Sequence, residues 1–182
     1  MSDTLNVAAG HGGLRAAEWL ARAQQDAAER HTRGALRRAS GIDDEELLER
    51  LRRLGITPDT LAVLELAPPI LVAWADGSMS RLERDRLRVL AVVRGVTEAH
   101  AAWPLVQHWM LQRPSAEGEQ VLLAGLRARL ERAPIRQRLK RRASILRDCE
   151  TVARAAGRVL GGPKVSRDER DTLASIEARL GA

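Results

Sequence analysis

The sequence contains no phenylalanine, no tyrosine and a single cysteine, Cys149. One cysteine can form neither an intramolecular disulfide nor a cysteine-based metal cage. Without phenylalanine and tyrosine, the hydrophobic core has to be built from Leu, Val, Ile and Ala, with some of the four tryptophans. Such a core favours helix-on-helix packing, because small side chains let helices approach closely.

Long hydrophobic runs are also missing. The longest run, residues 61–75, is shorter than the roughly 20 apolar residues that a membrane-spanning helix needs, and it contains Glu65 and two prolines. Residues 1–13 lack the basic segment followed by an apolar segment that defines a secretory signal. These absences predict a cytoplasmic protein with no transmembrane segment.

Charge is abundant and slightly unbalanced. The chain has 30 Lys and Arg against 24 Asp and Glu, which gives a formal net charge of +6. A basic balance is typical of proteins that bind anionic lipid or nucleic acid. An arginine-rich composition without any such partner explains the same balance equally well.

Helical periodicity extends over most of the chain, and no segment alternates apolar and polar residues as a strand would. We predict an all-α fold, a single bundle of about eight helices. Residues 1–13 are expected to be a flexible N-terminus, 14–56 a helical extension and 57–182 the main domain. The predicted helices cover residues 14–30, 42–54, 57–75 with a break or kink at Pro68-Pro69, 80–94, 97–112 with an interruption at Trp103-Pro104, 117–132, 134–160 and 166–180. Residues 33–40 are predicted to be a linker.

Two of these segments carry more detailed predictions. Residues 70–75 are apolar on nearly all sides, so this segment should be central and buried. Ser115 is predicted to cap the helix 117–132, with Leu122, Leu123, Leu126 and Leu130 facing inward.

Two of the predicted helices, residues 80–94 and 134–160, each have an apolar face that should point into the core. In the helix 80–94, the expected face consists of Met79, Leu82, Leu87, Leu90 and Val93. In the longest helix, the expected face consists of Ile135, Leu139, Ala143, Leu146, Cys149, Ala153, Ala156 and Leu160. These residues recur every three or four positions, as on one side of a helix. Cys149 is therefore interpreted as a small core residue and not as a nucleophile.

Two stretches of the chain resemble each other, residues 61–93 and residues 152–180. A shift of 86 positions aligns them without a gap, so that Ser80, Arg81, Glu83, Arg84, Asp85, Leu87 and Gly95 fall on Ser166, Arg167, Glu169, Arg170, Asp171, Leu173 and Gly181. In both copies the Ser-x-x-Glu pattern predicts a capping box, in which serine and glutamate side chains satisfy the first amides of a helix. We therefore predict two related helix–turn–helix units that face each other across the bundle.

A turn is expected before each capping box. Asp76-Gly77 supplies the first turn and Gly161-Gly162-Pro163 supplies the second. Asp76, Glu83 and Glu169 could alternatively form a divalent-cation site of low affinity. A helix–loop–helix calcium loop is incomplete here, because its first ligands would fall on Val72 and Trp74, which carry no side-chain oxygen, whereas calcium takes six or more oxygens. Capping is thus the main interpretation and the cation site the alternative.

The paired turns also resemble a known family. The resemblance is carried by Ala75, Asp76, Gly77, Ser80 and Glu83 in the first unit and by Val152, Ala153, Ser166 and Glu169 in the second. Residues 57–180 resemble the TerB-like helical domain of tellurite resistance, to which the N-terminal domain of the DjlA co-chaperone is related. The resemblance implies an all-helical fold, acidic residues gathered between the two turns, and a non-enzymatic role in stress response near membranes. Gly162 departs from the family, whose second unit usually has an aspartate there.

A basic flank runs along the longest predicted helix. It consists of Arg136, Lys140, Arg147, Arg154 and Arg158, which share one side of a helical wheel beside the apolar face. Such a stripe could follow anionic headgroups or phosphates. The other interpretation is a solvated flank that pairs with acids of other helices. No aromatic residue lies within the stripe, so base stacking is not expected and nucleic acid is the less favoured partner.

The sequence contains no glycine-rich phosphate loop, no Gly-x-Ser-x-Gly elbow and no dinucleotide fingerprint. We therefore expect no enzymatic activity and no cofactor, and interpret the chain as a TerB-like helical module that binds a protein partner. The alternatives are binding to an anionic membrane or nucleic acid through the basic flank, and a divalent-cation site at the Asp-Gly turn.

Overall fold

The computed structural model describes residues 21–24, 32–156 and 165–181, and every regular element in these ranges is a helix, which confirms the all-α prediction. Residues 21–24 and 32–40 are helical. The elements that follow are α2 (Glu45–Arg53), the 3-10 helix η1 (Leu61–Glu65), α3 (Ala67–Ala73), α4 (Arg81–Val93), α5 (Trp103–Leu111), α6 (Ala116–Glu131), α7 (Ile135–Ala156) and α8 (Arg167–Arg179). None of these described helices is long and apolar enough to cross a membrane.

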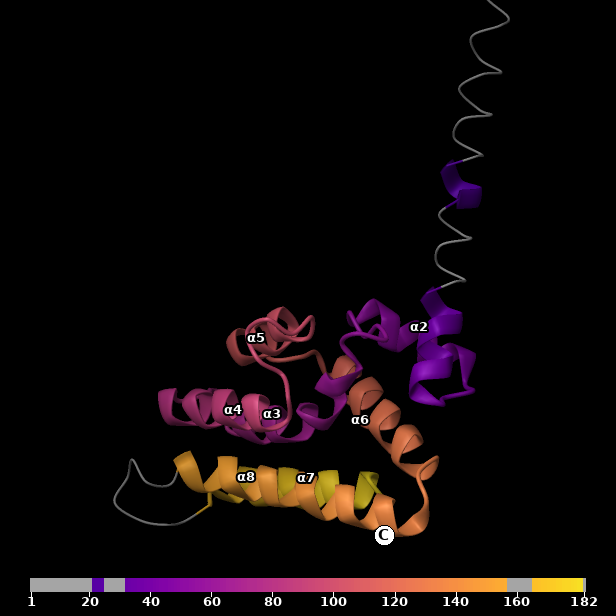
Figure 1. Ribbon diagram of the computed structural model, residues 1–182. Coiled ribbons are helices and arrows are strands. Elements are labelled where there is room, and N and C mark those ends of the chain that lie inside the picture. Colours follow the sequence, from indigo (N-terminus) through magenta and orange to yellow (C-terminus); the bar gives the residue numbers. More distant parts are fainter. Residues whose placement is uncertain (1–20, 25–31, 157–164, 182) are drawn as a thin grey trace, which may run out of the picture.

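The short helix α3 lies at the centre of the bundle. All of its residues, APPILVA, are apolar and buried, because α4, α6, α7 and α8 pack around it. In Figure 1, α3 and α4 lie together above α7 and α8. The prediction that the segment around Ile70 is central and buried is confirmed.

Helices α4 and α7 run side by side in opposite directions. Arg94, which caps the C-terminal end of α4, donates from Nε to Asp148 Oδ2 at 3.0 Å and from Nη2 to Ser144 Oγ at 2.8 Å, both on α7. Its Nη1 also donates to Glu65 Oε2 of η1 at 3.2 Å. The side chains of Arg94, Glu65 and Asp148 are largely shielded from water, so this cluster determines how α4 lies on α7.

The predicted linker at residues 33–40 is wrong, since residues 32–40 are helical. The helix forms because Leu36 is fully buried in the same core as α2 and α3, so tertiary packing offsets the low helix propensity of Gly34. It ends at Ser40, where the Gly41 amide donates to the Arg37 carbonyl at 2.8 Å. Of the predicted helix 14–30, residues 21–24 are helical and the remainder lies outside the described residues.

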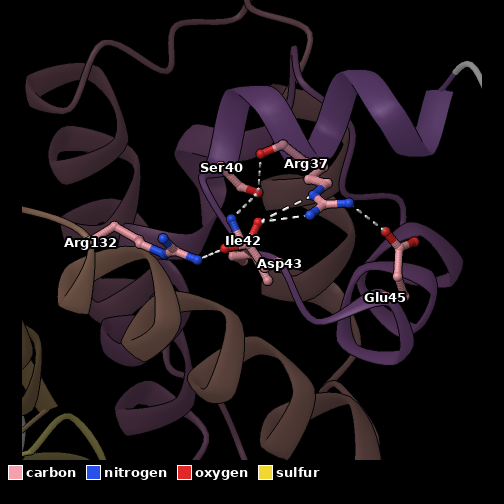
Figure 2. Close-up of polar contacts among 6 residues, drawn as sticks. All are labelled: Arg37, Ser40, Ile42, Asp43, Glu45 and Arg132. Atoms are coloured by element: carbon pink, nitrogen blue, oxygen red, sulfur yellow. Dashed lines mark hydrogen bonds and ion pairs between the residues drawn. The ribbon is translucent and has the colours of Figure 1, made fainter.

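A cluster of exposed charges joins this N-terminal helix to α2 and to the end of α6. Figure 2 shows Arg37 between two acids: its Nη2 lies 3.1 Å from Asp43 Oδ1 and its Nη1 lies 3.2 Å from Glu45 Oε1. Arg132, the residue after α6, pairs with the other oxygen of Asp43. Exposed pairs of this kind stabilise a fold by at most about 1 kcal/mol each, whereas complete burial of a leucine such as Leu36 contributes about 1.5–3 kcal/mol. Each exposed pair is therefore a smaller contribution than the packing of Leu36.

The helix predicted over residues 57–75 is broken beside Pro68-Pro69, which is one of the two alternatives expected there, and the prolines begin a new helix. The chain forms η1 over residues 61–65, and α3 starts at Ala67, immediately before Pro68 and Pro69. The first amides of a helix have no intrahelical acceptor, so proline is well tolerated there. The same reason explains α5, which begins at Trp103 with Pro104 in its first turn, where an interruption of the helix 97–112 was predicted.

The predicted apolar faces of α4 and α7 are only partly correct. On α4, Met79 and Leu87 are buried, but Leu82 and Val93 are exposed, and the buried stripe continues instead through Glu83 and Ala91. On α7, Cys149 and Ala153 are buried as predicted, whereas Ile135, Leu139 and Ala143 are exposed. Ile145 and Val152 belong to the core. The predicted face of α7 is therefore exposed at Ile135, Leu139 and Ala143, and Leu160 lies outside the described residues.

Helices α2 and α6 pack tightly against each other at Gly125. A Cβ atom added to Gly125 of α6 would lie 2.8 Å from Leu51 Cδ2 of α2, which is closer than carbon atoms pack. The prediction that Ser115 caps α6 is confirmed, because its hydroxyl accepts from the Gly118 amide at 3.1 Å. The predicted inward residues of this helix, Leu122, Leu123, Leu126 and Leu130, are all buried.

Candidate functional site

The two repeated helix–turn–helix units are called corners from here on. The first corner, residues 76–83, has the predicted turn and capping box. The Asp76 carboxylate accepts from the Ser78 amide at 2.9 Å, and Gly77 takes a φ of +88°, a conformation that glycine adopts without strain. The Ser80 amide then donates to Glu83 Oε2 at 2.7 Å, and the Glu83 amide donates to Ser80 Oγ at 3.3 Å. Both halves of the capping box are therefore present.

The second corner repeats this geometry. The Ser166 amide donates to Glu169 Oε2 at 2.6 Å, and the Glu169 amide donates to Ser166 Oγ at 3.1 Å. The turn predicted at residues 161–163, including Gly162, lies outside the described residues. The alignment of the two copies thus correctly predicts the two helix starts.

The two glutamates of the capping boxes are buried and interact with each other. Glu83 and Glu169 are each only 4% exposed. Burial raises the pKa of Glu83, the hydrogen bonds from Ser80 oppose this, and the negative charges of Glu169 and Asp76 raise the pKa further. Glu169 Oε1 is buried and has no hydrogen-bond partner among the described residues. The two corners consequently bring like charges together inside the bundle.

The cation site proposed from Asp76, Glu83 and Glu169 gains no support from this geometry. Over the described ranges, no group of three or more His, Cys, Asp or Glu side chains is placed to hold a metal ion. Asp76 is exposed and accepts hydrogen bonds from its own turn, while one oxygen of each glutamate accepts from a helix start. Cation binding by these residues stays an untested prediction.

Among the described residues, part of the basic flank of α7 forms an ion pair with a carboxylate and the rest does not. Arg136, Lys140 and Arg147 are exposed, and no carboxylate of the described residues lies within 4 Å of them. Arg154 is different, because its Nη2 lies 3.1 Å from Glu150 Oε2, one helical turn away. Arg158 lies outside the described residues. Three of the five predicted residues therefore present free positive charge along one side of α7.

Sequence reasoning missed a groove between α4 and α7. Its larger part is a cavity of about 400 Å³ lined by Leu82, Asp85, Arg86 and Val89 of α4 and by Thr151, Arg154 and Ala155 of α7. A smaller cavity of about 110 Å³ continues it and is lined by Arg86, Val89, Leu90 and Val93 of α4 and by Asp148, Thr151 and Val152 of α7. The two cavities share three lining residues, and we call them together the α4–α7 groove.

The α4–α7 groove is apolar on its α4 side. Leu82, Val89 and Val93 are 45%, 57% and 76% exposed. They follow one another at steps of seven and four residues and therefore share a side of the helix. This spacing was visible in the sequence, but Leu82 and Val93 also fit the inward stripe to which they were assigned. Only the position of α7 shows that they line a surface groove.

Cys149 takes no part in any of these sites. It is fully buried on α7, and this burial raises the pKa of its thiol well above the ordinary range. A thiol with a raised pKa is a poor nucleophile at neutral pH. Its interpretation as a core residue is confirmed.

Comparison with known proteins assigns no family: no family model matches the chain, and neither a curated protein nor a solved structure matches it.

Proposed function

We propose that this protein is a non-enzymatic helical module that acts by binding a protein partner. The α4–α7 groove carries this proposal, because exposed Leu and Val side chains on one side of a helix, beside a cavity of about 400 Å³, form a surface that a partner can cover. The two capping corners and the buried α3 hold the helices in place around this groove. The resemblance to TerB-like domains motivates the finer proposal that the partner belongs to a stress response.

Site-specific cross-linking in cells tests this proposal. A photoreactive amino acid replaces Val89 in the groove, and a matched protein carries it at Glu98, an exposed position in the turn before α5. We expect one defined cross-linked protein from position 89 and not from position 98, with competition by excess wild-type chain. Equal labelling from both positions, or none from either, would contradict the proposal.

Binding to an anionic membrane through α7 is the second candidate. It is favoured by Arg136, Lys140 and Arg147, which are exposed and have no carboxylate within 4 Å among the described residues. Attraction of this kind contributes about 1 kcal/mol per basic residue near the surface and is screened by salt.

Co-sedimentation with vesicles tests the second candidate. Binding is expected to phosphatidylserine-containing vesicles and not to pure phosphatidylcholine, and it should fall when Lys140→Glu and Arg147→Glu are combined or when salt is raised. The control combines Arg38→Glu and Arg53→Glu, which make the same change in net charge at exposed sites away from α7. Binding that is insensitive to salt, or equally reduced by the control, would exclude the α7 flank as the cause.

A further inference from the structure

Two of the described cations, Arg86 and Arg154, line the α4–α7 groove. Arg86 lines both cavities, with Leu82 one turn before it and Val89 and Val93 after it on α4. We propose that the groove binds an amphipathic helix of a partner protein whose apolar face carries a carboxylate that pairs with Arg86. This inference rests on the proposed function, and it adds the docking surface and the chemistry of the partner.

Arg86 is exposed, and no carboxylate of the described residues lies within 4 Å of it. The acids that line the groove already hold other arginines. Asp85 Oδ1 lies 2.9 Å from Arg88 Nη1, and Asp148 binds Arg94. Arg154, on the α7 side, is in turn paired with Glu150 at 3.1 Å. Arg86 is therefore the lining cation whose charge the described part of the chain leaves uncompensated.

A helix is the occupant that best fits the shape. Leu82 and Val93 are eleven residues apart on α4, which corresponds to about three helical turns, or roughly 16 Å. A helix laid along this length would place side chains spaced by three and four residues against Leu82, Val89 and Val93. A second copy of the chain is less suitable, because three partly exposed side chains are small compared with the roughly 800 Å² per partner that a standard interface buries.

The charge determines which helix fits. Docking removes water from Arg86, and an unpaired guanidinium beside apolar surface is unfavourable unless a carboxylate meets it. A carboxylate can accept two parallel hydrogen bonds from one guanidinium, which adds geometric selectivity. A helix with lysine at this position would instead bring two cations together.

The test uses two fluorescently labelled model helices that are identical except for Glu or Lys beside a Leu-rich face. Wild-type protein is expected to bind the Glu peptide about tenfold more tightly in anisotropy titrations. Arg86→Glu should reverse the preference, and Val89→Asp should weaken binding of both peptides. Arg38→Glu is the matched control, since Arg38 is also exposed with no carboxylate within 4 Å in the described chain and lies outside both proposed binding surfaces, and it should leave the preference unchanged. Circular dichroism checks that each variant is folded.

Several outcomes overturn the inference. They are equal binding of the two peptides, no effect of Arg86→Glu, and no binding of either peptide at millimolar concentration. A dimer that Val89→Asp dissociates in sedimentation would show that a second copy covers the groove. An intramolecular cross-link from position 89 to residues 157–164 would show that the chain covers it itself.

The same data separate this inference from the proposed function. A specific cellular cross-link at position 89, together with failure of both peptides, would leave the interaction function standing and remove the acidic helix as the partner. Absence of both the cross-link and the peptide binding would remove both proposals.

Discussion

At the scale of residues, Glu83 and Glu169 have two opposing effects on stability, one from their capping hydrogen bonds and one from their like charges. Glu83 accepts a hydrogen bond from the Ser80 amide at 2.7 Å. It is nevertheless buried near Glu169, whose Oε1 has no hydrogen-bond partner among the described residues. A carboxylate held in such a place stabilises the helix start through its hydrogen bond and destabilises the fold through its charge. The balance between the two effects depends on pH.

Glu83→Gln tests this balance. The folded pKa of Glu83 is raised above its ordinary value of 4.5, so its contribution to stability is full below that value and is lost as pH rises through the folded pKa. Glutamine keeps a capping acceptor and carries no charge. We expect thermal unfolding from pH 4 to pH 8 to show the variant gaining stability relative to wild type as pH rises. A constant difference across this range would contradict the prediction.

Gly125→Ala tests the contact between α6 and α2. A methyl group would meet the buried Leu51 at 2.8 Å, and overpacking costs about 1–3 kcal/mol, which outweighs the helix propensity of roughly 1 kcal/mol that alanine gains. We expect a net loss of about 1 kcal/mol in urea unfolding.

Gly34→Ala is the control for this prediction. Its added Cβ meets nothing closer than Arg38 Nη1 at 3.5 Å, so the propensity gain should appear as a stabilisation of about 0.5–1 kcal/mol. A stabilising effect at both positions would show that the α2–α6 contact accommodates a methyl group.

At the scale of elements, the relation between α4 and α7 matters most, because both walls of the groove come from these helices. Buried Leu87 and Ala91 place α4 on the core, and Arg94 joins its end to η1 and α7. Apolar packing has little directional preference, whereas the three acceptors of Arg94 determine one arrangement. The groove therefore depends on a polar cluster at its end.

Arg94→Ala should accordingly destabilise the protein. The change leaves Glu65 and Asp148 without their common partner in a site shielded from water, and we expect a loss of about 1–3 kcal/mol, between the values for exposed and fully buried pairs. Chemical denaturation measures it, with Arg88→Ala as the control, because the exposed pair of Arg88 with Asp85 should contribute about 0.5 kcal/mol or less. Equal effects of the two changes would show that the Arg94 cluster does not hold α4.

At the scale of the whole molecule, one hydrophobic core connects the N-terminal helices to the last one. Leu36 and Leu48 belong to the same cluster of buried side chains as Ile70, Leu126 and Ile176. A shared core predicts cooperative unfolding. The sequence predicts a helical extension that ends at residue 56 and a main domain that starts at residue 57. Unfolding experiments can test whether these two parts unfold separately.

Leu36→Ala tests whether the N-terminal helices unfold together with the main domain. Removing this fully buried side chain should cost about 2–5 kcal/mol, and hydrogen exchange should accelerate in α3 and α6 as well as in residues 32–40. Confinement of the faster exchange to residues before 57 would instead show that the N-terminal helices form a separate unit.

The sequence by itself determined the features that arise within one or two helical turns. The capping boxes at Ser80 and Ser166, the cap at Ser115 and the burial of the apolar segment around Ile70 could all be predicted from it, because their hydrogen bonds join residues three positions apart or their composition allows no exposed side.

Only the tertiary structure decided which face of α4 is covered by other helices. It also decided that residues 32–40 form a helix, packed through Leu36, where a linker was predicted. The position of Arg86 in a groove, without a carboxylate beside it among the described residues, is the third such feature. These features depend on helices from distant parts of the chain, such as α7, which begins more than 40 residues after the end of α4. Local periodicity shows that a helix has an apolar stripe, but where two stripes compete, packing against the other helices chooses between them.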